Sequence, residues 1–291
     1  MFPGFRNRPA RPVTIRPSMA APKPTAPKPT APVGNTLKRA LLVGINYVGT
    51  QYELAGCVND VVNMQNQLKV FFPKCQEYQM LTDSTTTKPT KANILAAINW
   101  LVTGLKPGEN IYMHFSGHGG QVADKNGDEP ADKMDECIYP CANGALEVIT
   151  DDELRSALVE KVPAGSKAFV VLDCCHSGTA VDLRYLWQAP SNGSLTFTEN
   201  TKYAKTAGNV LFLSGCRDPQ TAADTVDKTG RPAGALTMAL LDTWGKYGAV
   251  IKTKFLLWDV RKFLKTNGYS QVPELSTSTY IDLNQPFDLG A

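Results

Sequence analysis

The fold is decided by two stretches, Met113-His114-Phe115-Ser116-Gly117-His118-Gly119-Gly120 and Asp173-Cys174-Cys175-His176-Ser177-Gly178. Each follows a short apolar run, residues 111–112 and 168–172, and each breaks into small residues where a His or a Cys appears. This pattern indicates a buried strand that ends in a tight turn. Catalytic groups in open α/β sheets gather beyond the carboxyl ends of neighbouring strands. A Cys and a His delivered in this way predict a cysteine peptidase.

Strand and helix patterns alternate from residue 37 onward. We expect a mostly parallel central sheet with helices on both faces, an α/β fold, because alternating elements of this kind pack in that way. Residues 120–149 and 184–208 are predicted as long loops. The strands are predicted at residues 39–46, 78–81, 110–115, 167–173, 210–214 and 280–283, and the helices at residues 56–70, 91–101, 150–159, 234–244 and 254–264.

The first 36 residues differ in composition from the rest. They contain nine prolines, six basic side chains and no acid, and the five-residue unit Pro-Lys-Pro-Thr-Ala occurs twice. Removing these six from the 30 basic residues leaves 24 basic and 27 acidic side chains, a net charge of −3 for residues 37–291. We therefore predict a disordered Pro-rich tail at 1–36 and a peptidase domain at 37–291 that does not bind nucleic acid.

Composition also limits where the chain acts. No apolar run approaches the roughly 18 residues that cross a bilayer, and the N-terminus lacks the apolar stretch of a secretory signal. Seven cysteines, an odd number, fit a reducing compartment with unpaired thiols. We expect a monomeric cytoplasmic protein without a membrane span.

Three histidines compete for the role of general base. His176 adjoins Cys175, and adjacent residues leaving a strand point apart. His114 lies within its strand, where a hydrogen-bonded core histidine is the plainer interpretation. His118 lies at a strand exit among glycines, so its side chain can turn toward a substrate. The glycines also let backbone N–H groups approach a reacting carbonyl, and we predict an oxyanion hole from Gly119 and Cys175.

Cys174 and Cys175 compete for the role of nucleophile. Both could instead be core cysteines, which are among the most buried residue types. A metal site built on the two cysteines and a histidine is a weaker alternative, because adjacent cysteines rarely bind one tetrahedral ion. A redox protein built on this pair is a further alternative; like the metal site, it would lack peptidase activity.

Several motifs together resemble the metacaspases, in the caspase-like clan of cysteine peptidases. The resemblance implies a caspase-like sheet, a compact type I form, His118 as the base and Cys175 as the nucleophile. The animal caspase signature Gln-Ala-Cys-x-Gly is missing. The motifs extend from about residue 39 to 283, and besides the two opening stretches they are Gly44-Ile45-Asn46-Tyr47, Gly56-Cys57-Val58-Asn59-Asp60, Thr150-Asp151-Asp152-Glu153 and Leu213-Ser214-Gly215-Cys216.

Acidic residues near the nucleophile predict which bond is cut. Asp173 shares a strand face with Cys175 by alternation, and Asp60 near the start of a helix is a plausible second wall. Two carboxylates in one pocket favour a substrate cation. The resemblance implies that Cys57, Asp60, Ser116 and Asp173 line such a pocket. We expect cleavage of proteins or peptides after Arg or Lys and not after Asp; alternatively, Asp60 is an ordinary acid of a helix N-terminus.

A second acidic set suggests a cation site. Carboxylates from separate loops suit Ca²⁺, which takes six to eight oxygen ligands. The resemblance implies calcium binding by Asp135, Asp151, Asp152 and Asp182. An ion shared by these residues would order the loop after Cys175. The alternative is a solvated acidic face whose members include N-terminal helix charges.

Self-cleavage is a further expectation. Five of the six basic residues in the tail precede proline, which removes the N–H after the scissile position and stiffens the chain. We predict autocleavage in the exposed loop 184–208, at Arg184, Lys202 or Lys205. A scaffold with weak or no activity that works through protein interactions is the main alternative, but the retained Cys and His favour an enzyme.

Overall fold

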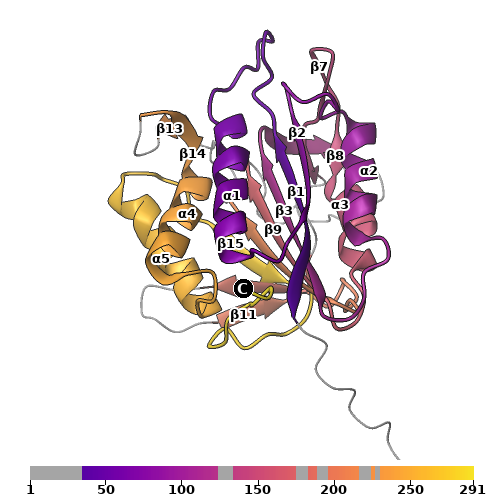
Figure 1. Cartoon of the computed structure of the whole chain (residues 1–291), viewed down its shortest axis with the longest axis vertical. Helices are drawn as coiled ribbons and strands as arrows, with labels where there is room; N and C mark the ends of the chain where they lie inside the picture. The colour runs from indigo at the N-terminus through magenta and orange to yellow at the C-terminus, as the bar shows by residue number, and fades with distance from the viewer. Residues whose placement is uncertain (1–34, 124–133, 175–182, 189–195, 216–223, 227–229) are drawn as a thin grey trace, which may run out of the picture. The chain divides into compact units, whose positions relative to one another are not determined.

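A sheet of eight strands runs through the computed structural model of the chain (Figure 1). The structure describes residues 35–123, 134–174, 183–188, 196–215, 224–226 and 230–291, all within the unit Pro32–Ala291. The predicted tail at 1–36 lies outside the described residues except for its last two positions, so that boundary stays a prediction.

The strand order is β11-β10-β15-β12-β9-β3-β1-β2. The five strands from β12 to β2 run parallel, and the last three pairings at the other edge are antiparallel. The prediction of a mostly parallel central sheet is therefore confirmed. The bounds are Thr36–Gly44 for β1, Glu77–Thr82 for β2, Glu109–Ser116 for β3, Lys167–Asp173 for β9, Asn209–Ser214 for β12, Glu274–Thr277 for β15, Tyr185–Gln188 for β10 and Thr196–Glu199 for β11.

Helices cover both faces of this sheet (Figure 1). One face packs against α1 (Cys57–Phe71), α4 (Ala235–Tyr247) and α5 (Thr253–Thr266). The other face packs against α2 (Lys91–Val102) and α3 (Asp151–Ala157), which a 3-10 turn (Val159–Lys161) follows. Among the residues that the structure describes, every helix is too short or too polar to cross a bilayer.

The two faces follow from the alternation of side chains along each strand. In β3, Tyr112 joins the core under α1, α4 and α5, whereas Met113 and Phe115 join the core under α2 and α3. Val171 and Leu172 of β9 divide in the same way. Strands that are apolar on both sides in this manner belong to a parallel sheet buried between helices.

The carboxyl ends of the central strands are level with one another. Gly44 of β1 pairs in register with Ser116 of β3, and Ser116 pairs with Asp173 of β9. Residues that leave β3 and β9 therefore emerge side by side at one edge of the sheet. This register places Ser116 of the first opening stretch beside Asp173, the first residue of the second.

Three sequence predictions about this architecture are wrong. The last strand is Glu274–Thr277, and residues 280–283 are not in a strand. Residues 184–208 supply β10 and β11 to the main sheet. Residues 120–149 contain the small strands Gly119–Ala123 (β4), Met134–Ile138 (β5), Cys141–Ala142 (β6), Ala145–Leu146 (β7) and Ile149–Thr150 (β8). A hairpin of Asp224–Val226 (β13) and Pro232–Gly234 (β14) then precedes α4.

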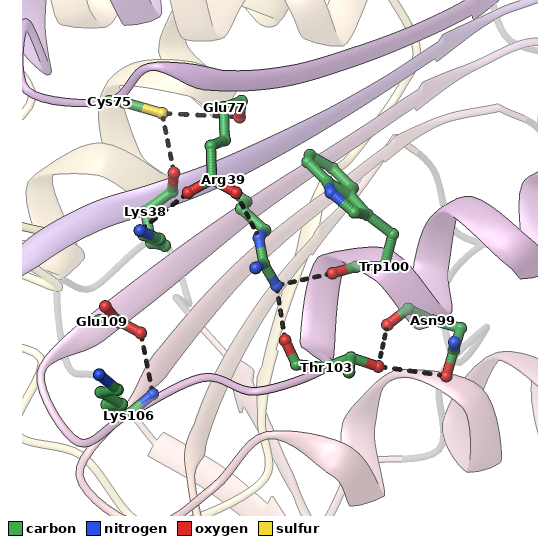
Figure 2. A network of polar contacts seen from close by, with 9 residues as sticks. All are labelled: Lys38, Arg39, Cys75, Glu77, Asn99, Trp100, Thr103, Lys106 and Glu109. Carbon is green, nitrogen blue, oxygen red and sulfur yellow. Dashed lines mark hydrogen bonds and ion pairs between the residues drawn. The ribbon is translucent and has the colours of Figure 1, made fainter.

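Arg39 links β1 to β2 and to the end of α2 (Figure 2). Its Nε donates to Glu77 Oε2 at 2.8 Å, and its Nη1 donates to the carbonyl oxygens of Trp100 and Thr103 at 2.8 and 2.7 Å. The carbonyls at a helix C-terminus lack intrahelical donors and carry partial negative charge, so a guanidinium suits them. The hydrogen bonds from Arg39 and Lys38 lower the pKa of Glu77.

Replacing Arg39 should therefore destabilise the fold more than replacing its neighbour Lys38. We expect Arg39→Ala to lower the free energy of unfolding by about 2 kcal/mol at neutral pH, because charged hydrogen bonds to partly buried acceptors are lost. The Lys38 side chain makes a solvent-exposed ion pair with Glu77, so Lys38→Ala should lower the free energy of unfolding much less than Arg39→Ala. Urea unfolding of both variants measures this difference.

The stability lost in Arg39→Ala should also depend on pH. A carboxyl group with a lowered pKa contributes stability above its unfolded pKa and loses it as the pH falls through the folded value. The difference in unfolding free energy between the wild type and Arg39→Ala should therefore become smaller below about pH 4. It should not vanish, because the wild type keeps the contacts of Arg39 with the carbonyl oxygens of Trp100 and Thr103. An equal loss of unfolding free energy in Arg39→Ala and Lys38→Ala would show that the contacts of Arg39 with the two carbonyl oxygens contribute nothing.

Candidate active site

His118 leaves β3 two residues after Ser116 and is held at both its backbone and its ring. Its N–H donates to the Tyr47 hydroxyl at 2.8 Å, and its Nε2 lies 2.8 Å from the carbonyl oxygen of Tyr52. A carbonyl can only accept, so Nε2 carries the proton and Nδ1 keeps its lone pair. The ring is thereby oriented as a base with Nδ1 as the basic atom.

The side chain of Tyr47 packs against the ring of His118. Its ring centroid lies 4.7 Å from that of the imidazole, and its hydroxyl donates to the carbonyl oxygen of Tyr139 at 2.8 Å. Its backbone φ of 52° is left-handed, which a bulky residue adopts only where the surroundings enforce it. A Cβ atom on Gly117 would lie 2.8 Å from the Tyr47 hydroxyl, so the position before His118 needs glycine.

Of the two cysteine candidates, the structure describes Cys174 but not Cys175. Cys174 is fully buried in the core under α2 and α3, where a substrate cannot reach its sulfur. Its location supports Cys175 as the nucleophile. Cys175 and His176 lie outside the described residues, so the geometry of the predicted Cys–His pair stays a prediction.

Three predicted pocket residues lie together at the level ends of the strands. Ser116 donates its hydroxyl to Asp60 Oδ2 at 2.6 Å. Asp60, near the start of α1, and Asp173, at the end of β9, are 1% and 3% exposed. Cys57 begins α1 one helical turn before Asp60 and is buried. The structure thus brings Asp60, Ser116 and Asp173 to one place, as the sequence predicts.

The N-terminus of α4 binds both carboxylates. The N–H of Gly234, the N-cap residue, donates to both oxygens of Asp60 at 2.9 and 3.0 Å. Thr237 donates its N–H and its hydroxyl to Asp173 Oδ2 at 2.8 and 2.7 Å. N–H groups in the first turn of a helix have no intrahelical partner, and the helix dipole favours negative charge there. These donors stabilise two buried like charges that would otherwise repel.

Gly234 lies between these carboxylates. A Cβ atom at this position would overlap Oδ2 of Asp173 and lie 2.7 Å from Oδ2 of Asp60. Any larger residue would therefore fill the space between the two acids. Sequence reasoning missed Gly234, Thr237, Tyr47 and Tyr52 as parts of the site. The one available signal was the predicted helix start at 234, because such a start offers unpaired N–H groups.

The predicted oxyanion residue Gly119 begins β4, directly after His118. It pairs in register with Ile138 of β5. The second predicted donor, the N–H of Cys175, lies outside the described residues. The assignment of the oxyanion hole therefore stays a prediction.

Three of the four predicted metal ligands form a cluster. Asp135 of β5 and Asp151 and Asp152 of α3 offer carboxylate oxygens within 4.8 Å of one another. Asp135 and Asp151 are buried, and Asp151 accepts hydrogen bonds from the N–H groups of Glu136 and Asp152 at 3.0 and 2.8 Å. The predicted capping box that starts α3 at Thr150 is present. Asp182 lies outside the described residues.

The predicted cleavage sites differ in exposure. Arg184 is not exposed as expected: its side chain is 17% exposed and pairs with Glu199 at 2.8 Å. Its Nη1 also donates to the carbonyl oxygen of Tyr203 at 2.9 Å. Lys202 and Lys205 are exposed in the segment between β11 and β12.

Comparison with known proteins agrees with the resemblance seen in the motifs. The family model described as "Metacaspase, peptidase C14 domain" matches residues 38–184. Metacaspase-1 of Mycosarcoma maydis is 36% identical over 86% of this chain and 72% of its own length. Metacaspase-5 of Trypanosoma brucei brucei is also 36% identical over 86% of this chain, which spans about half, 53%, of that relative.

Solved structures agree with the fold. A protein of Geobacter sulfurreducens matches with a TM-score of 0.61 at 25% identity, over 85% of this chain and 97% of its own. Caspase-1 of Spodoptera frugiperda matches with a TM-score of 0.52 at 12% identity, over 84% of this chain and 87% of its own, which supports the fold alone. By this family match and these identities, the chain belongs to the metacaspase family and is a caspase-like cysteine endopeptidase.

Proposed function

We propose that this endopeptidase cleaves after Arg or Lys, through an acyl-enzyme formed on Cys175, and that it depends on calcium. The observation that carries the specificity is the pair of buried carboxylates, Asp60 and Asp173, at the start of α4. A guanidinium or ammonium group that reaches these carboxylates gains charge pairing and hydrogen bonds, whereas a substrate Asp would add a third negative charge.

The chemistry follows from the orientation of His118. The thiol of Cys175 gives its proton to Nδ1 of His118, and the sulfur attacks the carbonyl carbon of the scissile bond. The C–N bond breaks as the imidazolium returns the proton to the leaving amine. Water, deprotonated by the same histidine, then attacks the thioester and frees the thiol. The Tyr52 carbonyl supports these steps because it holds the ring in one orientation.

The specificity is tested with peptides that end in Arg, Lys or Asp before a fluorogenic leaving group. We expect turnover of the Arg and Lys peptides and little of the Asp peptide, with Cys175→Ala inactive on all three. Gly234→Ala should reduce kcat/KM for the Arg peptide more than tenfold, about the effect of losing one charged hydrogen bond, because its methyl group would enter the space between the carboxylates.

Gly245→Ala is the matched control for that variant. Gly245 lies in the same helix, and no atom lies within 4 Å of a Cβ built there. Ala is the better helix former, so this variant should be folded and active. Equal or faster turnover of the Asp peptide by the wild type would refute the proposed specificity.

Calcium dependence is supported by the donor chemistry of the cluster of Asp135, Asp151 and Asp152. Three carboxylates from a strand and a helix present hard oxygen ligands within 4.8 Å of one another. Two of them are buried, and crowded buried anions favour a cation. These residues would hold Ca²⁺, which would neutralise the cluster and fasten α3 to β5.

Metal removal tests this part of the proposal. Excess EGTA should abolish turnover, and Ca²⁺ should restore it where Mg²⁺ does not, because Mg²⁺ gives up its water ligands reluctantly. Calorimetric titration of the Cys175→Ala protein with Ca²⁺ should show binding that Asp151→Asn removes and that Asp259→Asn, in α5, retains. Activity unchanged by the chelator, or titration without heat, would exclude calcium dependence.

Autocleavage is supported at Lys202 and Lys205 and disfavoured at Arg184. The two lysines are exposed between β11 and β12, whereas Arg184 is paired to Glu199 and adjoins β10 of the main sheet. A peptidase must bind its substrate chain in an accessible segment. N-terminal sequencing of autolysis products should find new ends at Tyr203 or Thr206. Fragments that begin at Tyr185, or at Pro24 or Pro29 in the tail, would contradict this.

A further inference from the structure

A row of hydrogen bonds extends from the core to Asp173. The hydroxyl of Tyr112 lies 3.0 Å from Nδ1 of His114, and Nε2 of His114 lies 3.0 Å from the Thr237 hydroxyl. That hydroxyl donates to Asp173 at 2.7 Å. Tyr112, His114 and Thr237 are all fully buried, so water does not compete for these contacts.

The direction of each hydrogen bond follows from the carboxylate at the end of the row. Asp173 Oδ2 accepts from Thr237, so the single hydroxyl proton of Thr237 is committed and its oxygen must accept from His114. Nε2 of His114 therefore carries the ring proton. Burial lowers the pKa of His114 to about 3, so the ring is neutral and Nδ1 accepts from Tyr112. Every donor points toward Asp173.

The geometry of β3 explains why these residues meet. Tyr112, His114 and Ser116 alternate along one strand face, the face that packs against α1 and α4. Ser116 binds Asp60, and His114 reaches the first turn of α4 at Thr237. One strand face thus contacts one carboxylate of the pocket directly and the other through Thr237.

We propose that Tyr112, His114 and Thr237 are positioning residues that orient Asp173 as an ionised wall of the substrate pocket. The inference rests on the proposed cleavage after Arg or Lys. Hydrogen bonds donated to a carboxylate favour its charged form and restrict its rotation, so the polarity of this row controls how well the pocket receives a cation. Tyr112 reinforces that polarity, because the proton that it donates holds Nδ1 of His114 in the accepting tautomer.

The test compares KM and kcat for an Arg-terminated peptide. Thr237→Val keeps the shape but removes the hydroxyl, and it should raise KM about tenfold with kcat within a factor of two, because the substrate cation is bound in both the ground and the transition state. Thr237→Ser should restore the wild-type KM. Tyr112→Phe, which keeps the core ring, should raise KM about threefold.

Thr243→Val is the matched control. Thr243 is a buried threonine of the same helix, and its hydroxyl donates to the Ala239 carbonyl away from the pocket. It should leave KM unchanged. If Thr237→Val does not fold, as judged by its thermal transition, Tyr112→Phe and Thr237→Ser carry the test.

Other outcomes separate the two proposals. A wild type that cleaves a Gln-terminated peptide as well as the Arg peptide would refute the proposed specificity itself. A wild type that prefers Arg, with KM unchanged in Thr237→Val and Tyr112→Phe, would overturn the positioning role alone. A fall in kcat without a rise in KM would mean general damage to the site and would also overturn it.

Discussion

Two buried carboxylates at the start of one helix are the arrangement on which the site depends. Asp60 and Asp173 come from α1 and β9, and both reach the N-terminus of α4. Burying two like charges side by side is costly unless each receives donors. The unpaired N–H groups of the first helical turn supply those donors, and in return the carboxylates satisfy the helix end. The start of α4 and the two carboxylates therefore stabilise each other.

Much of the sheet could be predicted because its central strands are apolar on both faces. The strand Lys167–Asp173 has the predicted bounds, since an uninterrupted apolar run ends there in polar and small residues. The strand Glu274–Thr277 was missed for the opposite reason. It is fully buried, yet it consists of Glu, Leu, Ser and Thr, so neither alternation nor hydrophobicity marks it. Only its pairing with β12 and β10 makes it a strand.

The residues of the site also differ in whether the sequence alone could predict their positions. His118 follows β3 and Asp173 ends β9, and a parallel sheet places strand ends at one edge, so their placement at the same edge could be inferred. The contacts of Gly234 and Thr237 could not. These hydrogen bonds join residues that are separated by 174 and 64 positions in the sequence. They depend on how α4 docks against the sheet. Local patterns report which segments form elements, whereas the docking of α4 depends on the whole core.

The small sheet of β4, β5 and β8 connects His118 to the cluster of Asp135, Asp151 and Asp152. β4 begins at the residue after His118, β5 contains Asp135 opposite Val122, and β8 leads directly into Asp151. One ladder of backbone hydrogen bonds thus lies between β4 and Asp135, and a second lies between β5 and the strand that precedes Asp151 and Asp152. The peptide that positions His118 and the carboxylates of Asp135 and Asp151 therefore belong to one hydrogen-bonded sheet, so the backbone itself links their spacing.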